Sequence, residues 1–168
     1  MSKVRFSDHE CPLAQALDEI GDWWTLLVVR EVMYGQSRFE AFRQQLGISR
    51  AVLSDRLSRL VQAGILQRQT QADDKRAADY SLTDKGRDLW PVIVAMLHWS
   101  QRHVVDGDVV RGVSRISGRP VDRICAVDTH GNIIEAGDTK LTAGGDASEH
   151  LRARIQAAFD PEAVDAQG

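Results

Sequence analysis

Apolar residues recur three and four positions apart in the segments 12–20, 23–34, 38–46 and 49–63, and a glycine follows each segment. This spacing places apolar side chains on one face of a helix, and glycine commonly ends a helix, so the pattern predicts four short α-helices. In the fourth segment Leu53, Leu57 and Leu60 form the stripe that we expect to face the core. Ser49 precedes it as an N-cap, because its hydroxyl can accept from the free N–H groups of the first turn.

The pattern changes after Gly64, where β-type segments at 65–70 and 78–82 flank a polar turn at 73–76. This arrangement predicts a hairpin. Thr83 then caps a helix that we expect to run to about Arg102, with Pro91 as the site of a kink.

Glycines and alternating Val and Ile follow residue 103, which predicts a small β-rich extension with a hairpin at 123–135 and a short helix at 149–159. The expected fold class is mainly α with a β-wing (α+β). The expected division is a DNA-binding and dimerisation domain at 1–102, an extension of unknown role at 103–160 and a disordered tail at 161–168.

Two short helices joined by a tight turn at Gly47 and Ile48, followed by a hairpin, have the order of a winged helix-turn-helix. If the leucine stripe of the fourth helix faces inward, its opposite face is small and polar near the N-terminus and can approach base edges closely. Arg50 is the candidate for a bidentate contact to guanine, and Asp55 could accept from cytosine or brace an arginine. The predicted DNA-contacting residues on this helix are Ser49, Arg50, Ala51, Ser54, Asp55 and Arg59.

Lys75 and Arg76 lie at the tip of the predicted wing, where phosphate or minor-groove contact is natural. The alternative is that these arginines and lysines are ordinary solvated surface. Arg56 lies beside the apolar stripe, so we expect it to form an internal ion pair.

The whole chain has a net charge of −3, which by itself argues against a nucleic-acid partner, because binding to phosphate requires lysine and arginine. The distribution of charge along the sequence changes this conclusion. Residues 36–87, the predicted helix-turn-helix and wing, carry 10 basic and 6 acidic side chains, whereas the segments on both sides are acidic. The positive surplus therefore coincides with the predicted DNA-binding part.

Several classes of protein are disfavoured. No apolar run approaches the ~20 residues of a membrane span, and no signal peptide is visible, so we expect a cytoplasmic protein without a membrane contact. The two cysteines are far apart and the histidines lack a metal-ligand spacing, so we expect no metal, no cofactor and no enzymatic activity.

The chain also carries a set of short motifs, which are Cys11-Pro12, Ile20-Gly21-Asp22-Trp23-Trp24-Thr25-Leu26-Leu27, Arg30-Glu31, Arg38-Phe39, Gly47-Ile48-Ser49, Leu53-Ser54-Asp55-Arg56-Leu57, Leu60, Gly64-Ile65-Leu66, Tyr80-Ser81-Leu82-Thr83-Asp84-Lys85-Gly86 and Trp99. With these motifs, residues 9–102 resemble the HxlR-type winged helix-turn-helix transcriptional regulators. The resemblance implies a bacterial, cytoplasmic homodimer that binds an inverted-repeat operator in double-stranded DNA, and we expect it to be a repressor. It also places Arg38 among the expected DNA-contacting residues.

In that family the N-terminal segment and the helix after the wing form the dimer interface. The corresponding residues here are Leu13, Leu17, Leu89, Ile93, Met96 and Trp99. The alternative for these apolar residues is the core of a monomer.

Cys11 precedes Pro12 at the start of a predicted helix, where free N–H groups and the helix dipole favour a thiolate. Several members of the resembling family use the cysteine at this position to sense oxidants or electrophiles, which implies a small-molecule or electrophile effector. Asp8 and Glu10 oppose a further negative charge, and an inert cysteine remains the alternative.

Two other functions stay open at this stage. Cys11 could be the nucleophile of a thiol enzyme, although no base or oxyanion motif can be placed beside it. The winged helix could instead bind a protein, in which case an uncompensated acidic potential should lie over the fourth helix.

Overall fold

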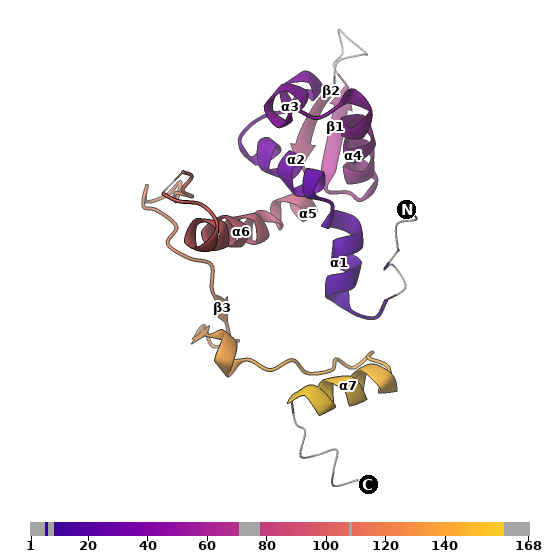
Figure 1. Ribbon diagram of the computed structural model, residues 1–168, viewed down its shortest axis with the longest axis vertical. Helices are drawn as coiled ribbons and strands as arrows, with labels where there is room; N and C mark the ends of the chain where they lie inside the picture. Colours follow the sequence, from indigo (N-terminus) through magenta and orange to yellow (C-terminus); the bar gives the residue numbers. More distant parts are fainter. Residues whose placement is uncertain (1–5, 7–8, 71–77, 108, 160–168) are drawn as a thin grey trace. The chain divides into compact units, whose positions relative to one another are not determined.

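The computed structural model describes residues 6, 9–70, 78–107 and 109–159 (Figure 1). The chain forms two compact units, one of residues 16–124 and one that combines residues 1–15 with 125–168. The helices and strands are α1 (Pro12–Ile20), α2 (Trp23–Met33), α3 (Phe39–Leu46), α4 (Arg50–Gln62), β1 (Leu66–Thr70), β2 (Ala78–Leu82), α5 (Asp84–Arg87), α6 (Trp90–His103), β3 (Ala126–Val127), β4 (Ile133–Ile134), the 3-10 turn η1 (Ala136–Asp138) and α7 (Glu149–Phe159). Helices with small antiparallel sheets confirm the predicted α+β class.

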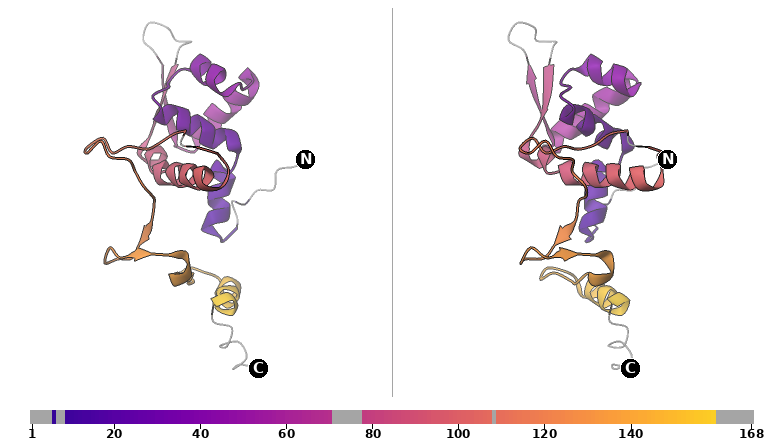
Figure 2. Two further views of the ribbon diagram at one scale, coloured as in Figure 1. Left: turned by 60° about the vertical axis from the view of Figure 1, so that its left-hand side comes forward. Right: turned by 90° about the vertical axis from the view of Figure 1, so that its left-hand side faces the viewer.

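The core of the larger unit lies where α2, α3 and α4 pack against the β1–β2 hairpin (Figures 1 and 2). The predicted stripe of α4 is confirmed, because Leu53, Leu57 and Leu60 are all buried. Phe42 of α3 and the Val28–Val29 pair of α2 complete the centre of this core. Burial of each such side chain contributes roughly 1.5–3 kcal/mol, so this core holds the helix-turn-helix against the hairpin.

The hairpin β1–β2 is antiparallel, with Leu66 opposite Leu82 and Thr70 opposite Ala78. The segment just before α3 extends this sheet, because Arg38 forms an isolated bridge with Asp79 and the Tyr80 N–H donates to the Ser37 carbonyl at 2.9 Å. The start of α3 is thereby tied to the second strand of the wing.

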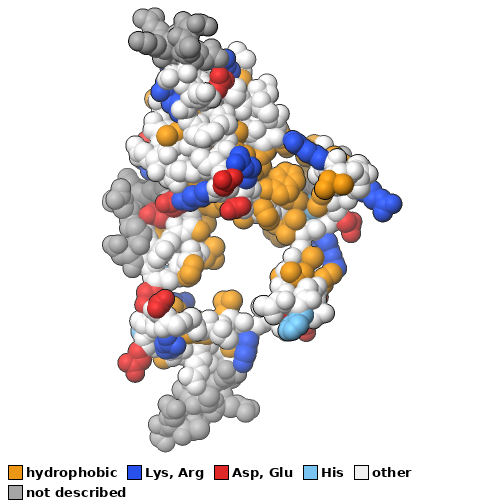
Figure 3. Space-filling model, turned by 180° about the vertical axis from the view of Figure 1, so that it is seen from behind, with side chains coloured by type: hydrophobic (Ala, Val, Ile, Leu, Met, Phe, Trp, Pro, Cys, Tyr) orange, Lys and Arg blue, Asp and Glu red, His pale blue; other side chains and the backbone are white. Residues whose placement is uncertain are grey.

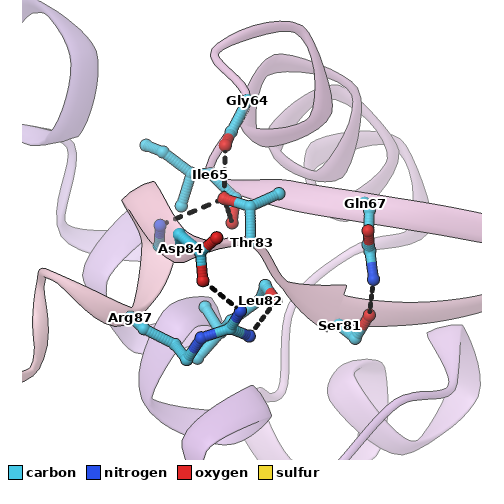
Figure 4. A network of polar contacts seen from close by, with 9 residues as sticks. Gly64, Ile65, Gln67, Ser81, Leu82, Thr83, Asp84 and Arg87 are labelled. Atoms are coloured by element: carbon cyan, nitrogen blue, oxygen red, sulfur yellow. Dashed lines mark hydrogen bonds and ion pairs between the residues drawn. The ribbon is translucent and has the colours of Figure 1, made fainter.

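Thr83 links the end of the hairpin to α5 and to the connection between α4 and β1 (Figure 4). Its hydroxyl lies 2.5 Å from the Gly64 carbonyl and 3.1 Å from the Ile65 carbonyl, and it accepts from the Gly86 N–H at 3.1 Å as the N-cap of α5. The predicted cap is thus confirmed, and the same side chain also holds the segment that connects α4 to β1.

The single helix expected from Thr83 to about Arg102 is wrong: two helices stand in its place. α5 ends at Arg87 and α6 begins at Trp90, with Pro91 in the first turn of α6. Proline has no N–H to donate to the preceding turn, and its ring clashes with that turn, so the chain restarts the helix instead of kinking it.

In the smaller unit the expected hairpin at 123–135 is present but shorter, with two-residue strands paired as Ala126 opposite Ile134 and Val127 opposite Ile133. The helix expected at 149–159 is confirmed as α7. None of the residues described in this unit is buried, and a two-stranded ribbon without a buried face is only marginally stable by itself. The tail expected at 161–168 lies outside the described residues.

Candidate nucleic-acid interface

The turn between α3 and α4 positions the exposed helix. Gly47 adopts the left-handed conformation with φ of 62°, which glycine reaches without the Cβ penalty, and it ends α3. Ile48 is buried in the core, and the next residue, Ser49, accepts from the Val52 N–H at 3.3 Å. The turn is therefore anchored by one apolar side chain and followed at once by a confirmed N-cap.

The face of α4 opposite the leucine stripe is exposed, as the spacing predicts. The exposed residues of α4 are Arg50, Ala51, Val52, Ser54, Asp55, Ser58, Arg59 and Gln62. Ser49 at the cap is exposed as well. Small side chains near the N-terminus leave the backbone of this end of the helix open to close approach.

Arg50 extends from the first position of α4 with 70% of its side chain exposed. Its guanidinium pairs with Glu40, from the first turn of α3, and lies over the Phe39 ring with 5.3 Å between the guanidinium carbon and the ring centroid. Glu40 also pairs with Arg43 at 2.8 Å. Sequence reasoning missed Glu40, although its place in the first turn of the neighbouring helix was the available signal.

The pKa of Glu40 lies below its ordinary value of 4.5, chiefly because Arg43 donates a hydrogen bond to it and also because of the positive charge of Arg50. The carboxylate is therefore ionised at neutral pH. Two arginines, Arg43 of α3 and Arg50 at the start of α4, therefore surround the single carboxylate of Glu40.

The charges in the middle of α4 are arranged as pairs. Asp55 braces Arg59 one helical turn away at 3.0 Å. Arg56 points inward and pairs with Asp22 at 3.0 Å, which confirms the predicted internal ion pair. The Asp22 side chain also accepts from the Trp24 N–H at 3.0 Å, so one carboxylate caps α2 and holds α4.

Arg38 lies at the N-cap position of α3, and its Nε is 2.8 Å from the Asp79 carboxylate on β2. The Ser37 hydroxyl donates to the same oxygen at 2.8 Å. The Arg38 side chain is exposed and paired with Asp79 within the chain. Its expected contact with DNA remains a prediction.

Lys75 and Arg76, expected at the wing tip, lie outside the described residues. Within the described part of the wing, Arg68 on β1 is an exposed basic residue that sequence reasoning did not select. Its position on a strand of the predicted wing was the signal for it.

The residues expected at the dimer interface separate into two groups. Leu13, Leu17, Met96 and Trp99 are 67%, 51%, 54% and 62% exposed. Ile93 is 7% exposed and belongs to the core, and Leu89 is packed against the same core. Only the first group is available to a partner without rearrangement.

Cys11 is half-buried and has a free thiol, as does the exposed Cys125. Cys11 directly precedes α1: its carbonyl accepts from the Gln15 N–H at 3.1 Å, and its own N–H donates to the His9 ring at 3.1 Å. Across the residues whose placement is described, we find no group of three potential metal ligands and no helix long and apolar enough to span a bilayer.

Comparison with known proteins agrees with this geometry. The family model of the HxlR-like helix-turn-helix matches residues 19–108. Rv3095 of Mycobacterium tuberculosis, a helix-turn-helix transcriptional regulator, is 38% identical over 92 residues, which are 55% of this chain and 58% of the relative. The match therefore spans little more than half of that relative.

Two solved structures extend the comparison. PA1607, a proposed transcription factor, shares 36% identity with a TM-score of 0.75 over 84% of this chain and 100% of its own. The redox regulator HypR in its oxidised form shares 31% identity with a TM-score of 0.51 over 59% of this chain and 100% of its own. The matched family model, which covers more than half of the sequence and includes the whole helix-turn-helix and wing, shows that this chain belongs to the HxlR-like helix-turn-helix family.

Proposed function

We propose that this chain is a homodimeric, sequence-specific DNA-binding transcriptional repressor that places α4 in the major groove. The observation that carries the proposal is the exposed face of α4, where small side chains are flanked by Arg50 and Arg59 while the leucine stripe is buried. A recognition helix needs this division, because it must pack against its own domain on one side and reach base edges on the other.

The charges around α4 also favour DNA over a protein partner. The acidic residues near the recognition face, Glu40 and Asp55, are each paired with arginine. The uncompensated acidic potential expected of a protein-binding winged helix is therefore not found on the described part of this face. Ser49 and Ser54 supply hydroxyls for phosphate or base, and Arg68 supplies a cation on the wing strand.

The homodimer is supported by exposed apolar side chains on two helices. Leu13 and Leu17 share one face of α1, and Met96 and Trp99 share one face of α6. Figure 3 shows apolar side chains reaching the surface of the unit that contains α6. A second copy that covers them would present two recognition helices, so the operator should be an inverted repeat with half-sites about one helical turn apart.

The test begins with selection of bound duplexes from a random pool, followed by affinity measurements on the selected and an unrelated duplex. We expect an inverted repeat, and we expect Arg50→Ala to weaken binding to the selected duplex more than to the unrelated one. Gln62→Ala, at the far end of the same exposed face, is the matched control. Equal binding to all duplexes, with no effect of Arg50→Ala, would overturn the proposal.

Repression is tested separately with a reporter gene downstream of the selected operator. Expression should fall when the wild-type protein is present and recover with Arg50→Ala. Increased expression would show an activator instead.

We further propose that oxidants or electrophiles act through Cys11. Its half-exposed free thiol at the start of α1 supports this, as does the similarity to the redox regulator HypR. Treatment with a peroxide should release the operator from wild-type protein but not from Cys11→Ser, with Cys125→Ser as the control. Identical release from Cys11→Ser would reject a role for this thiol.

A further inference from the structure

The guanidinium of Arg50 is held on two sides by the first turn of α3. The Phe39 ring lies beneath it at 5.3 Å, and the Glu40 carboxylate accepts from its Nη2. An exposed arginine ordinarily samples many rotamers, so its guanidinium can bind a nearby phosphate in many orientations. Here a cation–π contact and an ion pair restrict the side chain at the N-terminus of the recognition helix.

The two groups that hold Arg50 are themselves fixed. Phe39 is half-buried and packs against the core, and Glu40 receives a second contact from Arg43 Nε at 2.8 Å. Phe39 is therefore held by the core below it, and Glu40 is held by the guanidinium of Arg43 beside it. Arg50 has five N–H donors, and one carboxylate oxygen occupies only one nitrogen, so other N–H groups remain to face a ligand.

We propose that Glu40 is a positioning residue for sequence discrimination: it orients Arg50 for bidentate recognition of one guanine and lowers the affinity for DNA of other sequences. The inference rests on the proposed function of α4. Its physical basis is that a carboxylate near the duplex repels phosphate whatever the sequence, whereas the orientation that it imposes on Arg50 is useful only where a guanine edge matches it.

The expected consequence differs from that of an ordinary surface charge. Removing the charge of Glu40 should raise non-specific affinity slightly, because one negative group near the phosphates is lost. Discrimination at one base pair should fall, because Arg50 then samples orientations that suit a phosphate as well as a base. Loss of the Glu40 charge is therefore expected to raise the affinity for unrelated duplexes and to lower the discrimination at one base pair of the operator.

The experiment uses the full chain and the selected operator, together with duplexes altered one base pair at a time. The variants are Glu40→Gln, Arg50→Ala, the double variant, and Glu19→Gln as a control. Glu19 is exposed and paired with Lys85 at 3.1 Å, so its change removes the same charge from α1 instead of from the first turn of α3. Affinities are measured at several salt concentrations, and melting temperatures confirm that each variant folds.

Arg50→Ala should lose roughly 5- to 150-fold of discrimination at one base pair, the range of a bidentate contact. Glu40→Gln should lose at least about threefold of the discrimination at that same base pair, while binding an unrelated duplex as tightly as wild type or tighter. In the Arg50→Ala background, Glu40→Gln should cause no further loss of discrimination, because Glu40 acts through Arg50. Glu19→Gln should retain the wild-type discrimination.

Two results would overturn the proposal while leaving the proposed function standing. One is a Glu40→Gln variant that keeps full discrimination at the base pair that Arg50→Ala affects. The other is a Glu40→Gln effect that persists undiminished in the Arg50→Ala background. If no duplex is enriched from the pool, the proposed function itself has failed, which is a distinguishable outcome.

Discussion

Asp22 uses the two oxygens of one carboxylate for two different helices. Oδ1 accepts from the Trp24 N–H and caps α2, while Oδ2 pairs with Arg56 of α4 at 3.0 Å. The side chains of Asp22 and Arg56 are only 23% and 17% exposed, so the pair is screened less than a surface pair. At the scale of single residues, this contact joins α4 to α2.

Replacing Asp22 with alanine should lower the free energy of unfolding by roughly 2–3 kcal/mol, because it removes an N-cap and leaves Arg56 without its inward partner. Asp22→Asn should cost less, since asparagine retains the capping oxygen but not the charge. Denaturant unfolding at fixed protein concentration measures both. Equal losses for the two variants would mean that the cap contributes nothing.

The pKa of Glu40 gives a second prediction at this scale. The hydrogen bond from Arg43 is the largest cause of the lowered pKa, so Arg43→Gln should move that pKa back toward 4.5. Because the folded-state pKa is depressed, the ion pairs of Glu40 are intact above its unfolded-state value and are lost as the pH falls through the folded-state value. Titration of the Glu40 carboxyl by NMR checks this, and an unchanged pKa in Arg43→Gln would contradict it.

At the scale of elements, the junction after the wing depends on how closely α5 approaches the connection between α4 and β1. A Cβ on Gly86 would lie 2.2 Å from the Ile65 carbonyl oxygen and 2.9 Å from a Leu82 methyl group. Gly86 also donates its N–H to Thr83, whose hydroxyl contacts the carbonyls of Gly64 and Ile65 (Figure 4). The absence of a side chain permits this network.

Gly86→Ala should therefore destabilise the protein by roughly 1–3 kcal/mol, because backbone atoms must move to admit the methyl group. Gly137→Ala is the matched control, since a Cβ there meets nothing within 4 Å. Thermal unfolding compares the two variants. A Gly86→Ala protein as stable as Gly137→Ala would show that α5 can shift away from β1 at little cost.

At the scale of the whole molecule, many large apolar side chains are exposed to solvent in the single chain. The smaller unit has no buried residue among those described, and the larger unit leaves Met96 and Trp99 in solvent. Met96 and Trp99 lie three residues apart and therefore on the same side of α6, and exposed apolar side chains that gather on one side of a helix commonly mark an interaction site. The similarity to PA1607 extends over 84% of the chain, well beyond the matched family model, so the extension is part of what the two proteins share.

The double variant Leu17→Glu and Trp99→Glu should remain folded, because both side chains are exposed in the single chain, but should sediment as a monomer. It should also lose most of its operator affinity, since each half-site would then be bound independently. Ile116→Glu is the control, because Ile116 is fully exposed and lies outside the predicted interface. A dimer that survives the double variant but not Ile116→Glu would place the interface elsewhere.

The sequence predicted most of the helix-turn-helix because helical spacing and caps are local properties. The leucine stripe of α4 and the inward position of Arg56 follow from spacing, the caps at Ser49 and Thr83 follow from their hydroxyl side chains, and the structure confirms all of them. The break between α5 and α6 was missed because the pattern allowed Pro91 either to kink a long helix or to start a new one.

By itself, therefore, the sequence determined the order of the elements from α1 to β2, the buried and exposed faces of α4 and the family. Only the tertiary structure decided which side chains meet across elements: Arg50 with Glu40 and Phe39, Asp22 with Arg56, and Ile93 with the core instead of the surface. The physical reason is that periodicity reports the direction of a side chain relative to its own helix axis. Which partner it reaches depends on how the helices cross, and packing sets that angle.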